Sequence, residues 1–241
     1  ICPWLAWGSA SGERLRRRLL PALLGAGATV IVLLLLGMRQ GWALVAFGLS
    51  AFVGISLLAT FYYGTVNRVR RTGEVLPLAF WKTMSGHRRR YGAHLVHLGI
   101  VLMAVGLTGS SLYQKEVQIA LAPGEQIDVG PYSLTYDDFV SEELPDRQRF
   151  VARVDVRRGE RKLATLRPEK SFHWNVEQWV TEVAIRSSLK EDLYLILAGF
   201  EADGLASFRI LINPLVVWLW IGGGVLLGGG IVAWWPAKEG E

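Results

Sequence analysis

The chain contains few of the residues on which soluble catalytic and metal sites are usually built. Its 241 residues include one cysteine, Cys2, which excludes an internal disulfide and any metal or iron–sulfur site made of several cysteines. It has only four histidines. The sequence shows no Ser/His/Asp set, phosphate-binding glycine loop, zinc-ligand spacing or convincing pair of carboxylates. The common soluble enzyme classes therefore find no support in the sequence.

Apolar residues, by contrast, are abundant. Hydrophobic residues make up 51% of the chain, and ten residues are tryptophan. Four apolar runs approach or reach the length that crosses a bilayer, about 20 residues; they are residues 19–37, 42–63, 91–111 and 214–235. Tryptophan and tyrosine stand at several of their ends, as in interfacial belts. We therefore predict a membrane protein with four transmembrane α-helices.

The long segment between the third and fourth apolar runs has a different pattern of apolar and polar residues. Short runs of alternating or apolar residues are separated by Gly- and Pro-containing turns; the runs are 117–121, 126–129, 132–136, 151–156, 161–166, 181–185, 193–198 and 208–212. Seven or eight short strands without a helical pattern predict an inserted all-β domain, either a small antiparallel barrel or a sandwich.

These patterns divide the chain into five parts. The predicted parts are an N-terminal transmembrane hairpin (1–63), a basic cytoplasmic loop (64–90), a histidine-bearing transmembrane helix (91–112), a periplasmic β-domain (113–212), and a C-terminal transmembrane helix and tail (213–241). Because the first residue is Ile and not Met, we expect a piece of a longer protein.

The charges predict the orientation in the membrane. Residues 113–212 contain 17 acidic and 13 basic residues, whereas the rest of the chain contains 4 acidic and 13 basic ones. Those 13 bases flank the apolar runs, so the positive-inside rule places both termini in the cytoplasm and the β-domain outside. Basic clusters can also bind nucleic acid, but clusters that border membrane spans do not favour that function.

The third apolar run carries His94 and His97, just after the basic triplet Arg88–Arg90. Ionisable side chains within a bilayer are costly and are functional candidates by default, and imidazole is an axial ligand of haem iron. Residues three apart share one helix face, yet axial ligands approach iron from opposite sides. A bis-histidine haem would therefore need a second helix, and no other predicted span contains histidine. Packing or interhelical hydrogen bonding remains the alternative role.

The remaining histidines and the arginines have simpler interpretations. His173 is interpreted as a surface or strand-edge residue, and His87 as a solvated residue beside the membrane. The triplet Arg88–Arg90 is typical of a topology determinant, with contact to a haem propionate as the sharper alternative.

Several motifs in this order resemble the CcmF family of cytochrome c maturation, with its close relative NrfE. The matching residues are 3–7, 89–99, Tyr113, 116–117, 123–124, Tyr132, 135–136, 181–185, 192–194, 213–214, Trp218 and Trp220. The resemblance runs over nearly the whole chain but covers only about the C-terminal third of such proteins. It is consistent with a truncated chain or with one half of a split protein.

The resemblance implies a function. CcmF proteins are inner-membrane subunits of the haem lyase that attaches haem to apocytochrome c, and they hold a haem b between two transmembrane histidines. The histidine in the His-Leu-Gly context is His97, which is therefore the expected ligand of the haem iron. His94 does not match the axial ligand and is expected to tune or orient the haem site. The second axial ligand is expected outside this segment, so the piece alone should be inactive.

The resemblance also implies partners: CcmH-like haem lyase subunits, a CcmE-like haem chaperone, apocytochrome c and quinol. Two rivals remain. A non-redox membrane assembly scaffold would use its β-domain to dock partner proteins, and its histidines would only pack. A b-type cytochrome subunit of a respiratory complex would usually show two widely spaced histidines on each haem-binding helix. Only one predicted helix here carries any histidine, so we rank this rival last.

Overall fold

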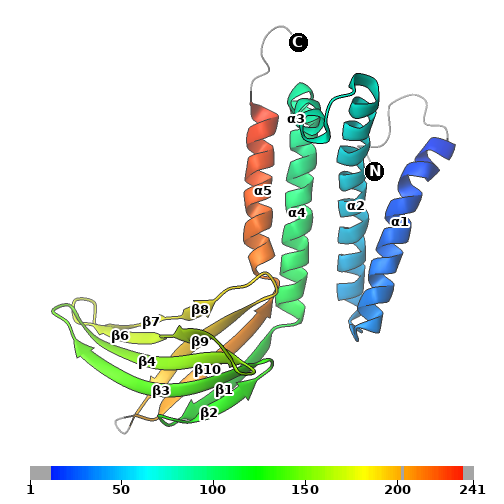
Figure 1. Ribbon diagram of the computed structural model, residues 1–241. Helices are drawn as coiled ribbons and strands as arrows, with labels where there is room; N and C mark the ends of the chain where they lie inside the picture. The colour runs from blue at the N-terminus through cyan, green and yellow to red at the C-terminus, as the bar shows by residue number, and fades with distance from the viewer. Residues whose placement is uncertain (1–11, 202–203, 236–241) are drawn as a thin grey trace. The chain divides into compact units, whose positions relative to one another are not determined.

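The computed structural model describes residues 12–201 and 204–235 (Figure 1). The chain divides into two compact units, a helical unit formed by residues up to Leu112 and from Trp218 onward, and a β-unit, Tyr113–Val217. Cys2 and residues 3–7, which carry part of the family resemblance, lie outside the described residues.

The described part of the chain contains five helices. They are α1 (Gly12–Leu35), α2 (Gly41–Thr72), α3 (Leu76–Gly86), α4 (Arg88–Leu112) and α5 (Val217–Trp234). Three of them, α2, α4 and α5, are long and apolar enough to cross a membrane. The apolar part of α1, Leu19–Leu35, is shorter, at the lower end of the range that spans a bilayer. The predicted membrane fold with an inserted β-domain is confirmed.

The segment predicted as a basic loop, residues 64–90, is mostly helical. No proline or glycine interrupts residues 65–72, so α2 continues to Thr72. It ends where Gly73 adopts a left-handed conformation (φ 70°) and donates its backbone N–H to the Val69 carbonyl over 2.8 Å, as glycine readily does at helix ends. Pro77 then lies in the first turn of α3, where its missing N–H costs least.

The β-unit is a sandwich of two antiparallel sheets. One sheet has the order β1-β10-β9-β8; the other has the order β2-β3-β4-β6-β7, with β5 pairing β4. The strands are β1 (Lys115–Leu121), β2 (Gln126–Val129), β3 (Tyr132–Glu143), β4 (Arg147–Arg158), β5 (Arg161–Leu166), β6 (Glu169–His173), β7 (Gln178–Glu182), β8 (Ala184–Arg186), β9 (Glu191–Phe200) and β10 (Ala206–Pro214).

The sandwich core consists of alternating side chains from both sheets. Tyr136, Val154, Leu195 and Phe208 are almost completely buried, and the ring of Tyr136 meets that of Phe208 edge-on at 5.1 Å. Full burial of one such side chain contributes roughly 1.5–3 kcal/mol. The hydroxyl of Tyr136 donates to the Gly204 carbonyl over 3.0 Å, which satisfies the one polar atom that this ring brings to the core.

The two ends of the β-unit lie side by side in one sheet. Strand β1, which follows α4, pairs with β10, which precedes α5, and Lys115 stands opposite Ile212 in this register. The sandwich is therefore inserted into the helical unit through two neighbouring strands.

Candidate functional site

His97 lies on an exposed face of α4. Its side chain is exposed, and its Nδ1 lies 2.7 Å from the carbonyl oxygen of Ala93, one turn earlier. A carbonyl oxygen can only accept, so in this bond Nδ1 carries the proton and donates it. In the neutral form of the ring, the other nitrogen, Nε2, then has a lone pair. The structure therefore presents His97 with its ring held by the backbone, and in the neutral form the ring can ligate through Nε2.

His94 lies elsewhere, although it is only three residues away. It is 8% exposed, and its ring packs edge-on against Phe61 of α2 and Tyr91 of α4, with both ring centroids 6.1 Å away. The offset between residues three apart is enough to bury one imidazole against α2 and leave the other outside. The two histidines do not face a common ligand, and His94 occupies a packing position.

A stripe of exposed residues runs along α4 from His97 toward the end of the helix. His97, Ile100 and Leu107 are all exposed, and their spacing is that of one helix face. We call these three residues the open face of α4.

The opposite part of α4 is locked against α5 by glycines. A Cβ atom on Gly92 would lie 2.5 Å from the Ala233 nitrogen, and one on Gly99 would lie 2.6 Å from the Gly222 oxygen. Small residues at these positions let two membrane helices approach closely. Because Gly92 and Gly99 lie on either side of His97 in sequence, this backbone contact holds the turn of α4 that presents the imidazole.

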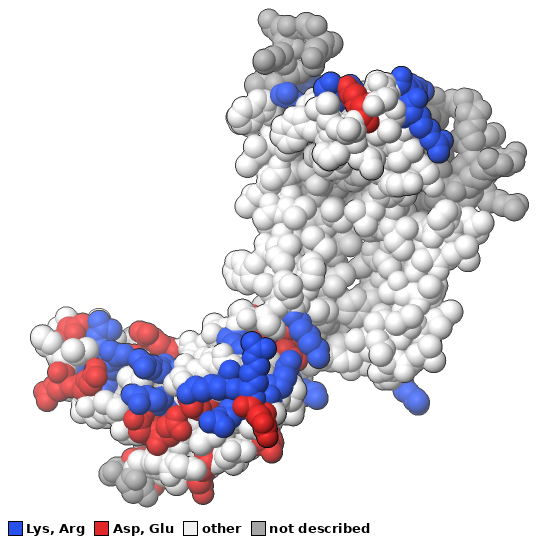
Figure 2. Space-filling view, in the orientation of Figure 1, with Lys and Arg blue, Asp and Glu red and all other residues white. Residues whose placement is uncertain are grey.

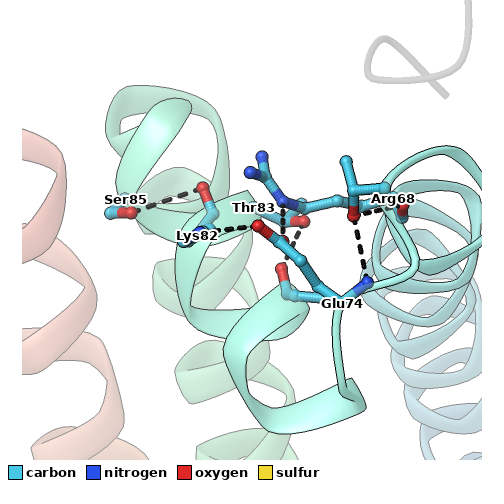
Figure 3. Close-up of polar contacts among 7 residues, drawn as sticks. Arg68, Glu74, Lys82, Thr83 and Ser85 are labelled. Carbon is cyan, nitrogen blue, oxygen red and sulfur yellow. Dashed lines mark hydrogen bonds and ion pairs between the residues drawn. The ribbon is translucent and has the colours of Figure 1, made fainter.

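A charged network joins the end of α2 to α3 (Figure 3). Glu74 accepts hydrogen bonds from Arg68 Nε at 2.8 Å and from Lys82 Nζ at 2.6 Å. These two donors, Arg68 first, lower the pKa of Glu74 to about 2. The carboxylate therefore stays ionised at neutral pH and ties α3 to the end of α2.

The β-unit offers no comparable site. Its surface carries interspersed acidic and basic residues (Figure 2). Two exposed aromatic residues lie at one edge of the larger sheet: Trp179 is in the edge strand β7, and Trp174 is in the turn before it. His173 is half-buried in β6, opposite Arg147 and Gln178. Across the described ranges, no group of three or more His, Cys, Asp or Glu residues is arranged to hold a metal ion.

Sequence reasoning missed the contact that orients His97. Neither histidine could be assigned a partner from the sequence, and the structure supplies one in the Ala93 carbonyl. The sequence signal is limited to the spacing, which places Ala93 one helical turn before His97. The predicted haem ligand and the predicted tuning residue, His97 and His94, remain proposals.

The chain is similar to proteins of cytochrome c biogenesis. Residues 112–214 match the family described as the CcmF C-terminal beta-sandwich. Cytochrome c-type biogenesis protein CcmF of Pseudomonas aeruginosa is 30% identical over 194 residues, which are 80% of this chain and 28% of that protein. NrfE of Haemophilus influenzae is 28% identical over 134 residues, 56% of this chain and 21% of that protein.

One solved structure is similar to this chain over a larger share of its length. The structure of "Cytochrome c Heme Lyase CcmF" superposes with a TM-score of 0.78 and 26% identity, covering 97% of this chain and 37% of that one. The chain thus spans well under half the length of each of these relatives. The matches confirm the predicted resemblance: this chain belongs to the CcmF family and contains the family's C-terminal β-sandwich.

Proposed function

We propose that the chain is the C-terminal part of a cytochrome c haem lyase subunit and that His97 supplies one axial ligand to a transmembrane haem b. The observation that carries the proposal is the imidazole of His97, exposed on α4 and bound at Nδ1 to the Ala93 carbonyl. Metal-bound histidines usually donate their second ring N–H to such an acceptor, which fixes the ring and raises its basicity.

The residues of this chain fit one side of a bis-histidine haem. His94 packs against Phe61 and Tyr91 and is not available as the opposite ligand, so a helix covering the open face of α4 would have to bring the second imidazole. When bound, haem b supplies reversible one-electron chemistry within the membrane. The chain itself holds the imidazole by the hydrogen bond that His97 Nδ1 donates to the Ala93 carbonyl oxygen. It also fixes α4 through the α4–α5 glycine contact.

The charge distribution supports an orientation for this arrangement. Basic residues gather around the α2–α3–α4 end of the helical unit (Figure 2), including Arg70, Arg71 and Arg88–Arg90. By the positive-inside rule this end faces the cytoplasm, so α4 runs outward and the β-sandwich is periplasmic. His97 is nine residues into α4, about 14 Å along the helix axis, a depth at which a quinol in the membrane could donate electrons.

The partners follow from the family and are part of the proposal. A haem lyase subunit would meet CcmH-like subunits, a CcmE-like haem chaperone and apocytochrome c. The exposed aromatic residues Trp174 and Trp179 favour the β-sandwich as a docking surface, since aromatic residues are enriched at interfaces. If docking were the sole function, this chain would be the non-redox scaffold described above.

The haem content of the assembled complex separates the two functions. We expect His97→Ala to lose most of the b-type haem that is measured as pyridine haemochrome per protein. Ile100→Ala, on the same open face, is the matched control and should retain the haem. Equal haem content in the wild type and His97→Ala would favour the scaffold.

A further inference from the structure

A pocket of about 270 Å³ lies in the helical unit, where the end of α2 meets α3 and the start of α4. Residues from all three helices line it; they are Gly64, Asn67, Arg68, Arg71, Thr72, Thr83, His87, Arg90 and Tyr91. The lining includes three arginines and one histidine but no acidic residue. Such a concave, cationic site suits an anion.

The arginines of this pocket differ in their partners. Arg71 and Arg90 are exposed and make no ion pair with any residue in the described ranges. Arg68 donates from Nε to Glu74, and Glu74 also binds Lys82 (Figure 3). Glu74 is therefore occupied by two donors, and no acidic side chain in the described ranges pairs with Arg71 or Arg90.

Tyr91 is a second, independent indication of a ligand. Its side chain is 5% exposed, and its hydroxyl lies against Gly64, where a Cβ atom would overlap it. Both residues line the pocket, and the hydroxyl makes no hydrogen bond with the residues that the structure describes. The side chain is buried while its hydroxyl opens onto the pocket, so an anion there could accept a hydrogen bond from it.

We propose that the pocket between α2, α3 and α4 binds a phosphate group. Arginine forks match phosphate oxygens in pairs and form strong, charge-assisted hydrogen bonds with them. A phosphate offers more acceptor oxygens than a carboxylate, which suits a lining of several donors. The pocket lies at the basic end of long apolar helices, where the phosphates of anionic lipids are found. The phosphate belongs either to a lipid headgroup or to a soluble phosphate.

The test measures binding of phosphatidylglycerol to the purified chain by native mass spectrometry, with diacylglycerol of the same acyl chains as the phosphate-free probe. The double variant Arg71→Gln/Arg90→Gln should weaken phosphatidylglycerol binding about tenfold, equivalent to about 1.4 kcal/mol. The control is Arg70→Gln/Arg89→Gln, which removes the same charge from exposed neighbours that do not line the pocket. It should change binding less than about twofold.

The remaining outcomes identify the source of the phosphate or overturn the proposal. Retention of phosphatidylglycerol in millimolar inorganic phosphate assigns the site to a lipid headgroup, whereas displacement assigns it to soluble phosphate. Equal losses in both double variants, or no loss in either, would show that only diffuse surface charge attracts the lipid, and the proposal would be wrong. Thermal unfolding checks the fold of each variant, and the single variants Arg71→Gln and Arg90→Gln replace the double variant if it is unstable.

Discussion

The Nδ1 of His97 donates a hydrogen bond to the carbonyl oxygen of Ala93 over 2.7 Å. In the neutral form of the ring, this contact places the proton on Nδ1, since the carbonyl cannot donate. It also turns an exposed side chain of a membrane helix into an oriented one. The ring of His94, one turn earlier, is oriented differently, because it packs against Phe61 and Tyr91.

The contact between α4 and α5 predicts that Gly99 and Gly223 differ in how much stability is lost when each is replaced by alanine. Gly99→Ala should destabilise the helical unit by about 1–3 kcal/mol, the usual cost of overpacking, because the new Cβ meets the backbone of α5 at 2.6 Å. The measurement is thermal unfolding in detergent. The control is Gly223→Ala, where no atom lies within 4 Å of the new Cβ and a helix gains slightly from alanine. Equal destabilisation by both changes would contradict the close packing.

The Arg68–Glu74–Lys82 network predicts a pH dependence. The pKa of Glu74 is lowered from 4.5 to about 2, so its stabilising contribution is fully present above pH 4.5 and is lost as the pH falls toward 2. Glu74→Gln should therefore be less stable than the wild type at pH 7, and the difference should shrink on acidification. Hydrogen exchange of the α3 amides across this pH range measures the difference in stability between the two proteins. A constant difference between the two proteins would refute the prediction.

A second pH dependence is expected in the β-sandwich, at alkaline pH. Burial, and then the charge of Asp138, raise the pKa of Tyr136 from 10.0 to about 12. The unfolded tyrosine ionises first, so stability is lost between about pH 10 and pH 12.

Tyr136→Phe tests this alkaline loss directly. The variant should lose less stability than the wild type between about pH 10 and pH 12, because it has no hydroxyl to ionise at this position. At pH 7 it should be less stable than the wild type by about 1 kcal/mol, because it lacks the hydrogen bond to Gly204. Amide exchange in β3 and β10 reports both effects. An unchanged alkaline loss in the variant would assign it to other groups.

Much of the architecture was predictable from the sequence, because apolar runs and period-two alternation are strong local signals. Strand β6 was missed since its sequence, Glu-Lys-Ser-Phe-His, is mostly polar and does not read as a strand by composition. The single strand expected at 181–185 lies across β7 and β8, which belong to different sheets. Such divisions depend on pairing between distant segments and leave little local trace.

The candidate site was only partly predictable. Spacing placed His94 and His97 near each other on one helix, but it could not say which of them would pack against α2. That choice depends on Phe61, which is distant in sequence and contacts His94 only in the folded helical unit. The phosphate pocket was not predictable for the same reason, since three helices contribute its lining.

The most direct test of the central claim is chemical rescue of His97→Gly in the assembled complex. Removal of the side chain should abolish the low-spin b-type signal in the reduced-minus-oxidised optical spectrum, and added imidazole should restore it, because free imidazole can occupy the space that His97 leaves. His94→Gly should keep the signal without imidazole. A full b-type signal in His97→Gly before any imidazole is added would contradict the assignment of His97 as an axial ligand.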